Sequence, residues 1–83
     1  MNFRLTKISE KELKKLPPKL QKIIITKILD LASISQTNQV KKLENSPYFR
    51  LRIGDYRVIF QYSSRVMIRV IHIAHRKDAY RPN

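Results

Sequence analysis

The spacing of apolar residues changes along the chain, and each change predicts a different element. Residues 2–8 alternate apolar and polar side chains, as a short strand does. Ser9 and Glu12 then fit the S-x-x-E capping box, in which each side chain satisfies a free backbone N–H at the start of a helix. Pro17-Pro18 stops this helix, and Pro18 suits the first turn of the next one.

A second helix is predicted from about Pro18 to Ile34, because its apolar residues recur at helical spacing. The inward stripe and the residues that widen it are Leu20, Ile24, Ile28 and Leu31 with Ile23, Ile25 and Leu29. So broad a stripe predicts packing against a sheet; a helix lying on a membrane surface is the alternative, and it would leave the sheet uncovered. Residues 35–47 are polar, so we expect a loop there, which includes Lys41 and Lys42.

Gly54 and Asp55 are the centre of a predicted two-residue hairpin turn, with glycine first as a type II′ turn prefers. The register that follows places Arg52 opposite Arg57. Because side chains alternate across a strand, the hairpin has two distinct faces. One face holds Phe49, Leu51, Ile53, Tyr56, Val58 and Phe60. The other holds Tyr48, Arg50, Arg52, Arg57, Ile59 and Gln61. We expect the first face to pack on the helices and the second to be open.

The three arginines of the expected open face repel one another. Like charges directly opposite each other, as Arg52 and Arg57 are here, destabilise a hairpin. A bound anion would offset this repulsion, so the pattern predicts an anion-binding face.

A third strand of the same sheet is predicted from about Arg65 to Ala74. A two-residue turn at Ser63-Ser64 places His72 on the arginine face, whereas a three-residue turn places Arg69 there. The pattern leaves both registers open.

These elements predict an α+β fold of order β-α-α-β-β-β, with two N-terminal helices packed on a small antiparallel sheet. A chain of 83 residues fits one domain, residues 1–83. It has no Cys, which excludes disulfides and suits a reducing cytoplasm. No apolar run approaches the roughly 20 residues that span a bilayer, and the N-terminus lacks a signal-peptide pattern. We therefore expect a cytoplasmic protein with no membrane partner.

The net charge of +12 is spread over both halves of the chain, with +5 in residues 1–40 and +7 in residues 41–83. Such a field favours a polyanionic partner, which could be a nucleic acid, an anionic membrane or an acidic protein. We favour a nucleic acid or an acidic protein, and a solvated basic surface is the alternative.

Two segments carry a resemblance to a known family. They are YFRLRIGDYRVIF at residues 48–60 and AHRKDAY at residues 74–80. Together with the predicted elements, they resemble the RelE/ParE superfamily of toxins from type II toxin–antitoxin systems. The closing motif resembles the RelE branch, which implies a ribosome-dependent endoribonuclease (an mRNA interferase) that cleaves mRNA in the A site and inhibits translation. The ParE branch, which inhibits DNA gyrase, usually lacks this ending.

The resemblance implies roles for individual residues. Arg57 matches the arginine that binds the scissile phosphate, Arg76 the arginine near the leaving group, and Tyr80 the aromatic that stacks on the RNA. Arg50 and Tyr48 fall where RelE has lysines, and an arginine is a poor general base because it keeps its proton. These departures leave a third possibility, a RelE-like fold with weak or lost nuclease activity.

The implied reaction uses the 2′-OH of the RNA as nucleophile, so we expect no metal ion and no cofactor. His75 is a candidate acid or base, since imidazole exchanges protons near neutral pH; the alternative is that it only shapes the loop before Arg76. We expect His72 to be a half-buried strand residue. Candidate contacts to ribosomal or messenger RNA are Lys41, Lys42, Arg52, Lys77 and Arg81. The resemblance also implies a cognate antitoxin with an acidic, amphipathic segment.

Overall fold

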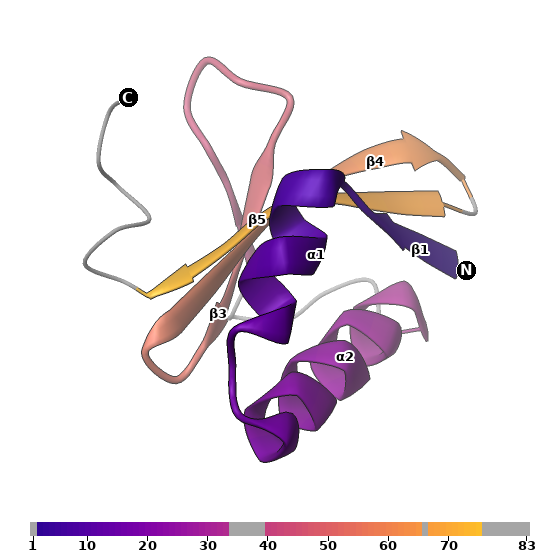
Figure 1. The fold of residues 1–83 in the computed structure, drawn as a ribbon. Coiled ribbons are helices and arrows are strands. Elements are labelled where there is room, and N and C mark those ends of the chain that lie inside the picture. The colour runs from indigo at the N-terminus through magenta and orange to yellow at the C-terminus, as the bar shows by residue number, and fades with distance from the viewer. Residues whose placement is uncertain (1, 34–39, 66, 76–83) are drawn as a thin grey trace.

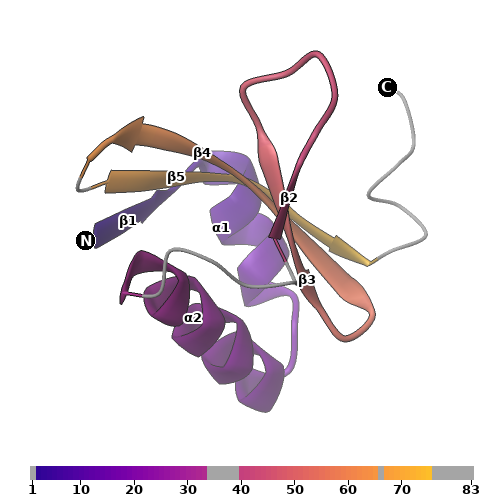
Figure 2. The same cartoon turned by 180° about the vertical axis from the view of Figure 1, so that it is seen from behind.

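The computed structural model describes residues 2–33, 40–65 and 67–75. Its elements are β1 (Asn2–Leu5), α1 (Lys7–Lys14), α2 (Pro18–Ser33), β2 (Val40–Lys42), β3 (Phe49–Ile53), β4 (Tyr56–Ser64) and β5 (Met67–His75). The strands form one twisted sheet in the order β1-β5-β4-β3-β2, and α1 lies against β5 in both views (Figures 1 and 2). The α+β prediction with two N-terminal helices is therefore confirmed.

The sheet differs from the predicted one at both edges. β2 lies within the segment predicted as a loop, and it pairs with β3 so that Lys41 is opposite Arg50. A three-residue edge strand with two lysines has too few apolar residues to show a period of two, although such short, charged edges are common because they prevent aggregation. At the other edge, β1 runs parallel to β5, so the sheet is mostly and not entirely antiparallel.

The β3–β4 hairpin has the predicted register from Phe49–Phe60 to Ile53–Tyr56. Gly54 has a φ of +56°, and Asp55 does not have a positive φ, which fits a type II′ turn. The face expected to pack on the helices does so, since Val58 and Phe60 are fully buried in the core. The turn therefore fixes which side chains face the helices.

A bulge in β5 combines the two registers that the sequence left open. Ile59 is opposite His72 and Phe60 is opposite Val70, so Ile71 is an extra residue in the ladder. Beyond this bulge Gln61 is opposite Arg69. Arg69 and His72 therefore lie on the same face of the sheet as Arg57.

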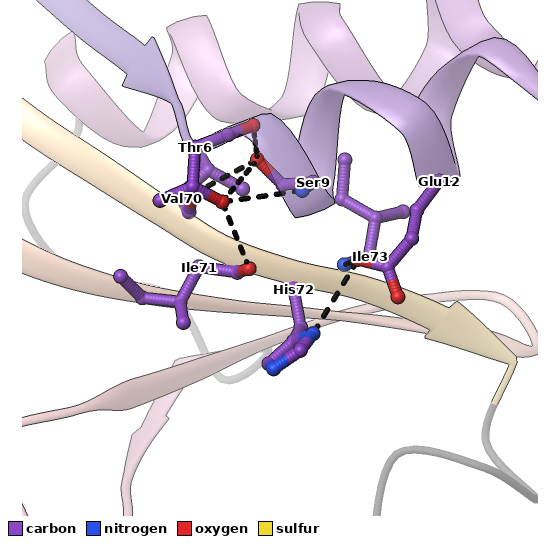
Figure 3. A network of polar contacts seen from close by, with 7 residues as sticks. All are labelled: Thr6, Ser9, Glu12, Val70, Ile71, His72 and Ile73. Carbon is purple, nitrogen blue, oxygen red and sulfur yellow. Dashed lines mark hydrogen bonds and ion pairs between the residues drawn. The ribbon is translucent and has the colours of Figure 1, made fainter.

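The first helix begins earlier than predicted. Thr6 is the N-cap of α1, because its side-chain oxygen accepts a hydrogen bond from the Ser9 N–H at 3.1 Å. Ser9 is instead buried inside the helix, where its hydroxyl donates to the Val70 carbonyl at 3.0 Å. The predicted capping-box partner, Glu12, accepts a hydrogen bond from the Ile73 N–H at 2.9 Å. Beyond the end of β1, side chains of α1 thus form the hydrogen bonds to the edge of β5 (Figure 3).

The core lies between the helices and the sheet. α2 contributes Ile24, Ile28 and Leu31 to it. The predicted stripe was too broad, because Ile23 and Leu29 are 42% and 48% exposed. Successive residues of an α-helix are rotated by about 100°, which places both residues more than a quarter turn from the centre of the buried stripe. Their side chains therefore do not face the sheet. Within the described residues, no helix has the length and hydropathy needed to cross a membrane.

Candidate nucleic-acid interface

The sheet has one face on the core and one face that we call the open face. Strand alternation places six cationic side chains on the open face: Arg4, Lys41, Arg50, Arg52, Arg57 and Arg69. None of the five strands contains Asp or Glu. The described part of the open face therefore presents positive charge that no strand carboxylate balances.

Arg57 lies at the centre of this charge. It is directly opposite Arg52 on β3 and Ala74 on β5. Arg50 and His72 are its diagonal neighbours on the same two strands, at the separation of about 7–8 Å that is typical of diagonal neighbours in a sheet. Long side chains reach one another across such diagonals, so these groups can converge on one bound anion.

Arg57 is less open than the hairpin pattern predicted. Its side chain is only 8% exposed, and its Nε and Nη1 atoms are shielded from solvent, as is Nε of Arg50. Arg57 lies on the middle strand of the sheet, with two strands on each side of it. Arg52, nearer the hairpin turn, is exposed. A guanidinium in such a poorly solvated position attracts a phosphate more strongly than one in bulk water does.

The two lysines of β2 diverge. Lys41 pairs with Arg50 and extends the open face, whereas Lys42 pairs with Phe49 and points to the other side of the edge strand. Both side chains are exposed. Only Lys41 therefore joins the cations around Arg57.

His75 does not lie beside Arg57 in the structure. His75 is opposite Tyr56, and their rings meet edge to face with centroids 5.4 Å apart. Tyr56 belongs to the core-facing side of the hairpin, so His75 and Arg57 lie on opposite faces. The remaining predicted site residues, Arg76, Lys77, Tyr80 and Arg81, lie outside the described residues.

A second cluster of cations surrounds a depression at the β1 end of the sheet. Its volume is about 570 Å³, and its lining includes Arg4, Lys7, Arg69, Ser63 and Ser64. Cations and hydroxyls are the groups that bind phosphate oxygens. Arg4 was not predicted as a site residue, because the parallel pairing of β1 with β5 leaves no turn signal in the sequence.

The described residues do not bring together three His, Cys, Asp or Glu side chains that could hold a metal ion. Arg50, Arg52 and Arg57 instead present guanidinium groups, whose chemistry suits an anion. Guanidinium groups bind phosphate through paired, charge-assisted hydrogen bonds. The arrangement can therefore bind a phosphodiester and stabilise added negative charge on it.

The family comparison covers almost the whole chain. A family model described as the ParE toxin of the type II toxin–antitoxin system parDE matches residues 3–80. No curated protein matches the chain in sequence.

Solved structures with the same fold include chains of RelB–RelE toxin–antitoxin complexes. The RelB–RelE complex of Methanococcus jannaschii contains a chain with 26% identity and a TM-score of 0.72, covering 92% of this chain and 93% of that one. The RelBE2 complex of Mycobacterium tuberculosis matches at 22% identity and a TM-score of 0.73, covering 89% and 95%. The intact RelBE complex of E. coli matches at 18% identity and a TM-score of 0.73, covering 88% and 93%. From the extent of the family match and this shared fold, the chain belongs to the RelE/ParE superfamily of type II toxin–antitoxin toxins.

Proposed function

We propose that this protein is a ribosome-dependent endoribonuclease that cleaves mRNA in the A site and so inhibits translation in the cytoplasm. The observation that carries the proposal is the position of Arg57, poorly solvated at the centre of a cationic face whose strands hold no carboxylate. Such a face attracts polyanions, and it suits the phosphodiester backbone of RNA.

The proposed reaction requires only groups of the RNA and of this chain. The 2′-oxygen attacks the adjacent phosphorus, the bond from phosphorus to the 5′-oxygen breaks, and the products are a 2′,3′-cyclic phosphate and a 5′-OH. Arg57, assisted by Arg52, stabilises the charge that builds on the phosphoryl oxygens. Arg76 near the leaving group and Tyr80 stacking on a base complete the proposed site, by analogy with the RelE branch.

The rest of the cationic surface gives affinity. Lys41 and Arg69 extend the open face in two directions from Arg57, and Arg69 also lines the depression that contains Arg4. RNA phosphates bound along this path would hold the scissile phosphate in register with Arg57. Contacts from Lys42, Lys77 and Arg81 to ribosomal or messenger RNA belong to the same proposal.

An antitoxin is the proposed protein partner. The three similar structures described above are toxin–antitoxin complexes by their own description. A segment that binds the open face of this protein must place carboxylates against Arg50, Arg52 and Arg57. We therefore expect an acidic antitoxin segment, and charge reversal at Arg50 and Arg52 should weaken the complex.

Inhibition of DNA gyrase is the second candidate function. It is favoured by the family match, whose model is described as a ParE toxin. A gyrase inhibitor traps its target by binding, so it has no need of a catalytic arrangement around Arg57. The two functions thus differ in their dependence on this residue.

The deciding experiment is a translation reaction with purified ribosomes, in which mRNA 5′ ends are mapped with and without the protein. New 5′ ends inside A-site codons, absent when ribosomes are omitted, would support the nuclease. A supercoiling assay with purified gyrase runs in parallel. Intact mRNA with inhibited supercoiling would replace the nuclease by the gyrase inhibitor, and intact mRNA with normal supercoiling would indicate a toxin fold without either activity.

A further inference from the structure

His72 contacts a carboxylate that comes from a different element. Its Nδ1 atom lies 3.5 Å from Oε1 of Glu12 on α1 (Figure 3). The His72 side chain is 42% exposed and that of Glu12 is 28% exposed. At this distance the carboxylate attracts an N–H on Nδ1, which leaves the second ring nitrogen to point away from the helix.

A hydrogen bond to the backbone of β5 fixes the position of the Glu12 carboxylate. Oε1 of Glu12 also accepts the hydrogen bond from the Ile73 N–H at 2.9 Å. Two further bonds fix the start of α1 on the same strand: the Ser9 hydroxyl donates to the Val70 carbonyl at 3.0 Å, and the Thr6 hydroxyl donates to the Ile71 carbonyl at 3.2 Å. The helix therefore presents the carboxylate to His72 at a fixed place.

The bulge at Ile71 decides which face His72 occupies. Downstream of it, His72 is opposite Ile59 and Ala74 is opposite Arg57, so His72 and Arg57 are diagonal neighbours on the open face. An imidazole in this place is within reach of a phosphodiester bound at Arg57. The other histidine of the chain, His75, faces the opposite side against Tyr56.

We infer that His72 is the general base of the proposed ribonuclease and that Glu12 is its positioning residue. The inference rests on the proposed function. Nε2 of His72 takes the proton of the attacking 2′-OH as the bond from the 2′-oxygen to phosphorus forms. The bond to the 5′-oxygen breaks, that oxygen takes a proton from water, and the imidazolium returns its proton to the resulting hydroxide.

This assignment fills the role that the arginines cannot fill. Arg50 and Arg57 keep their protons, so they stabilise charge but do not accept a proton. A histidine whose Nδ1 is oriented by a carboxylate has its Nε2 available as an acceptor, which is the arrangement that general-base histidines use in other enzymes. Among the described open-face residues, His72 is the one imidazole.

The test compares the two histidines in the ribosome-dependent cleavage reaction, with single-turnover rates measured for His72→Gln and His75→Gln. General-base catalysis typically contributes about 100-fold or more, so we expect His72→Gln to lose that factor and His75→Gln to cleave at the wild-type rate. Added imidazole should restore cleavage by His72→Gly, since the half-exposed position leaves room for it. Thermal unfolding of each variant checks that the fold is kept.

The Glu12→Gln variant tests the positioning role, because glutamine keeps the acceptor for the Ile73 N–H and loses the charge. We expect it to slow cleavage in the wild-type background and to add nothing to His72→Gln. Equal slowing in both backgrounds would overturn the positioning role. The base assignment alone would be overturned if His72→Gln cleaved mRNA at the wild-type rate. Failure of added imidazole to restore cleavage by His72→Gly would also overturn it. A wild-type protein that cleaves no mRNA would overturn the proposed function, and this inference with it.

Discussion

Arg52 on β3 and Arg57 on β4 lie directly opposite each other on the open face of the sheet. Cross-strand pairs of like charge cost stability, because the two Cβ atoms are only about 4.5–5.5 Å apart. Arg52 is exposed, whereas Arg57 is buried. The exposed member of the pair can therefore be changed without opening the core.

Neutralising Arg52 should stabilise the free protein. Arg52→Gln removes the repulsion on Arg57, so the free energy of unfolding should rise by roughly 0.2–1 kcal/mol, which thermal unfolding detects as a rise of a few degrees in Tm. Arg65→Gln is the matched control, because Arg65 is an exposed turn residue outside the strand ladders. A Tm for Arg52→Gln no higher than that of the control would show that the pair costs nothing.

Arg69 should contribute to RNA binding through phosphate contacts. Arg69 is exposed on the open face beside the depression. In Arg69→Gln, the plot of log affinity against log salt concentration should fall less steeply, with its slope reduced in magnitude by about one. The measurement is the affinity for ribosomes at several salt concentrations. Lys27→Gln, which removes an exposed charge from α2, should leave the slope near that of wild type. An equal reduction of the slope in both variants would mean that ribosome affinity depends only on the net charge of the protein.

The N-cap of α1 should be Thr6. Thr6→Ala removes the acceptor for the Ser9 N–H and the bond to the Ile71 carbonyl, so it should cost about 1–2 kcal/mol in urea unfolding. Thr26 is exposed in the middle of α2, where alanine is the better helix former, and Thr26→Ala should be neutral or slightly stabilising. If the two substitutions have equal effects, the cap does not hold α1.

Phe60 should be the most sensitive core position. It is fully buried and stacks on Phe49 with ring centroids 5.6 Å apart. Phe60→Ala should cost about 3–5 kcal/mol, a large part of the stability of a small domain, and denaturant unfolding measures this loss. Tyr62→Phe keeps the ring of a neighbouring, 38% exposed side chain and should stay within about 0.5 kcal/mol of wild type. A small cost at Phe60 would mean that the core repacks around the cavity.

The hairpin was predictable from sequence, and the sheet edges were not. Gly54 and the alternation from Phe49 to Phe60, which only Ile59 interrupts, leave one register that gathers the other apolar residues on one face. Arg50, Arg52 and Arg57 could therefore be placed on the opposite face in advance. The start of the first helix was misplaced. The S-x-x-E pattern indicated Ser9 as the N-cap, whereas Thr6 has this position and the Ser9 hydroxyl bonds to β5.

The part of the site on β5 needed the structure. Val70, Ile71 and Ile73 are apolar on both sides of the strand, so no alternation shows where the extra residue of the bulge lies. That residue decides that Arg69 and His72 both join Arg57. The contact between His72 and Glu12 spans sixty positions of the chain, and it depends on α1 covering the β5 edge. Local patterns carry no signal for such a contact.

The most direct test of the account is the chemistry of the mRNA ends formed on ribosomes by the wild-type protein and by Arg57→Gln. If the open face drives attack by the 2′-OH, the wild-type protein should yield a 2′,3′-cyclic phosphate upstream and a 5′-OH downstream of an A-site cut. Arg57→Gln should yield neither above background. Ends that carry a 5′-phosphate, or cleavage that persists in Arg57→Gln, would contradict the account.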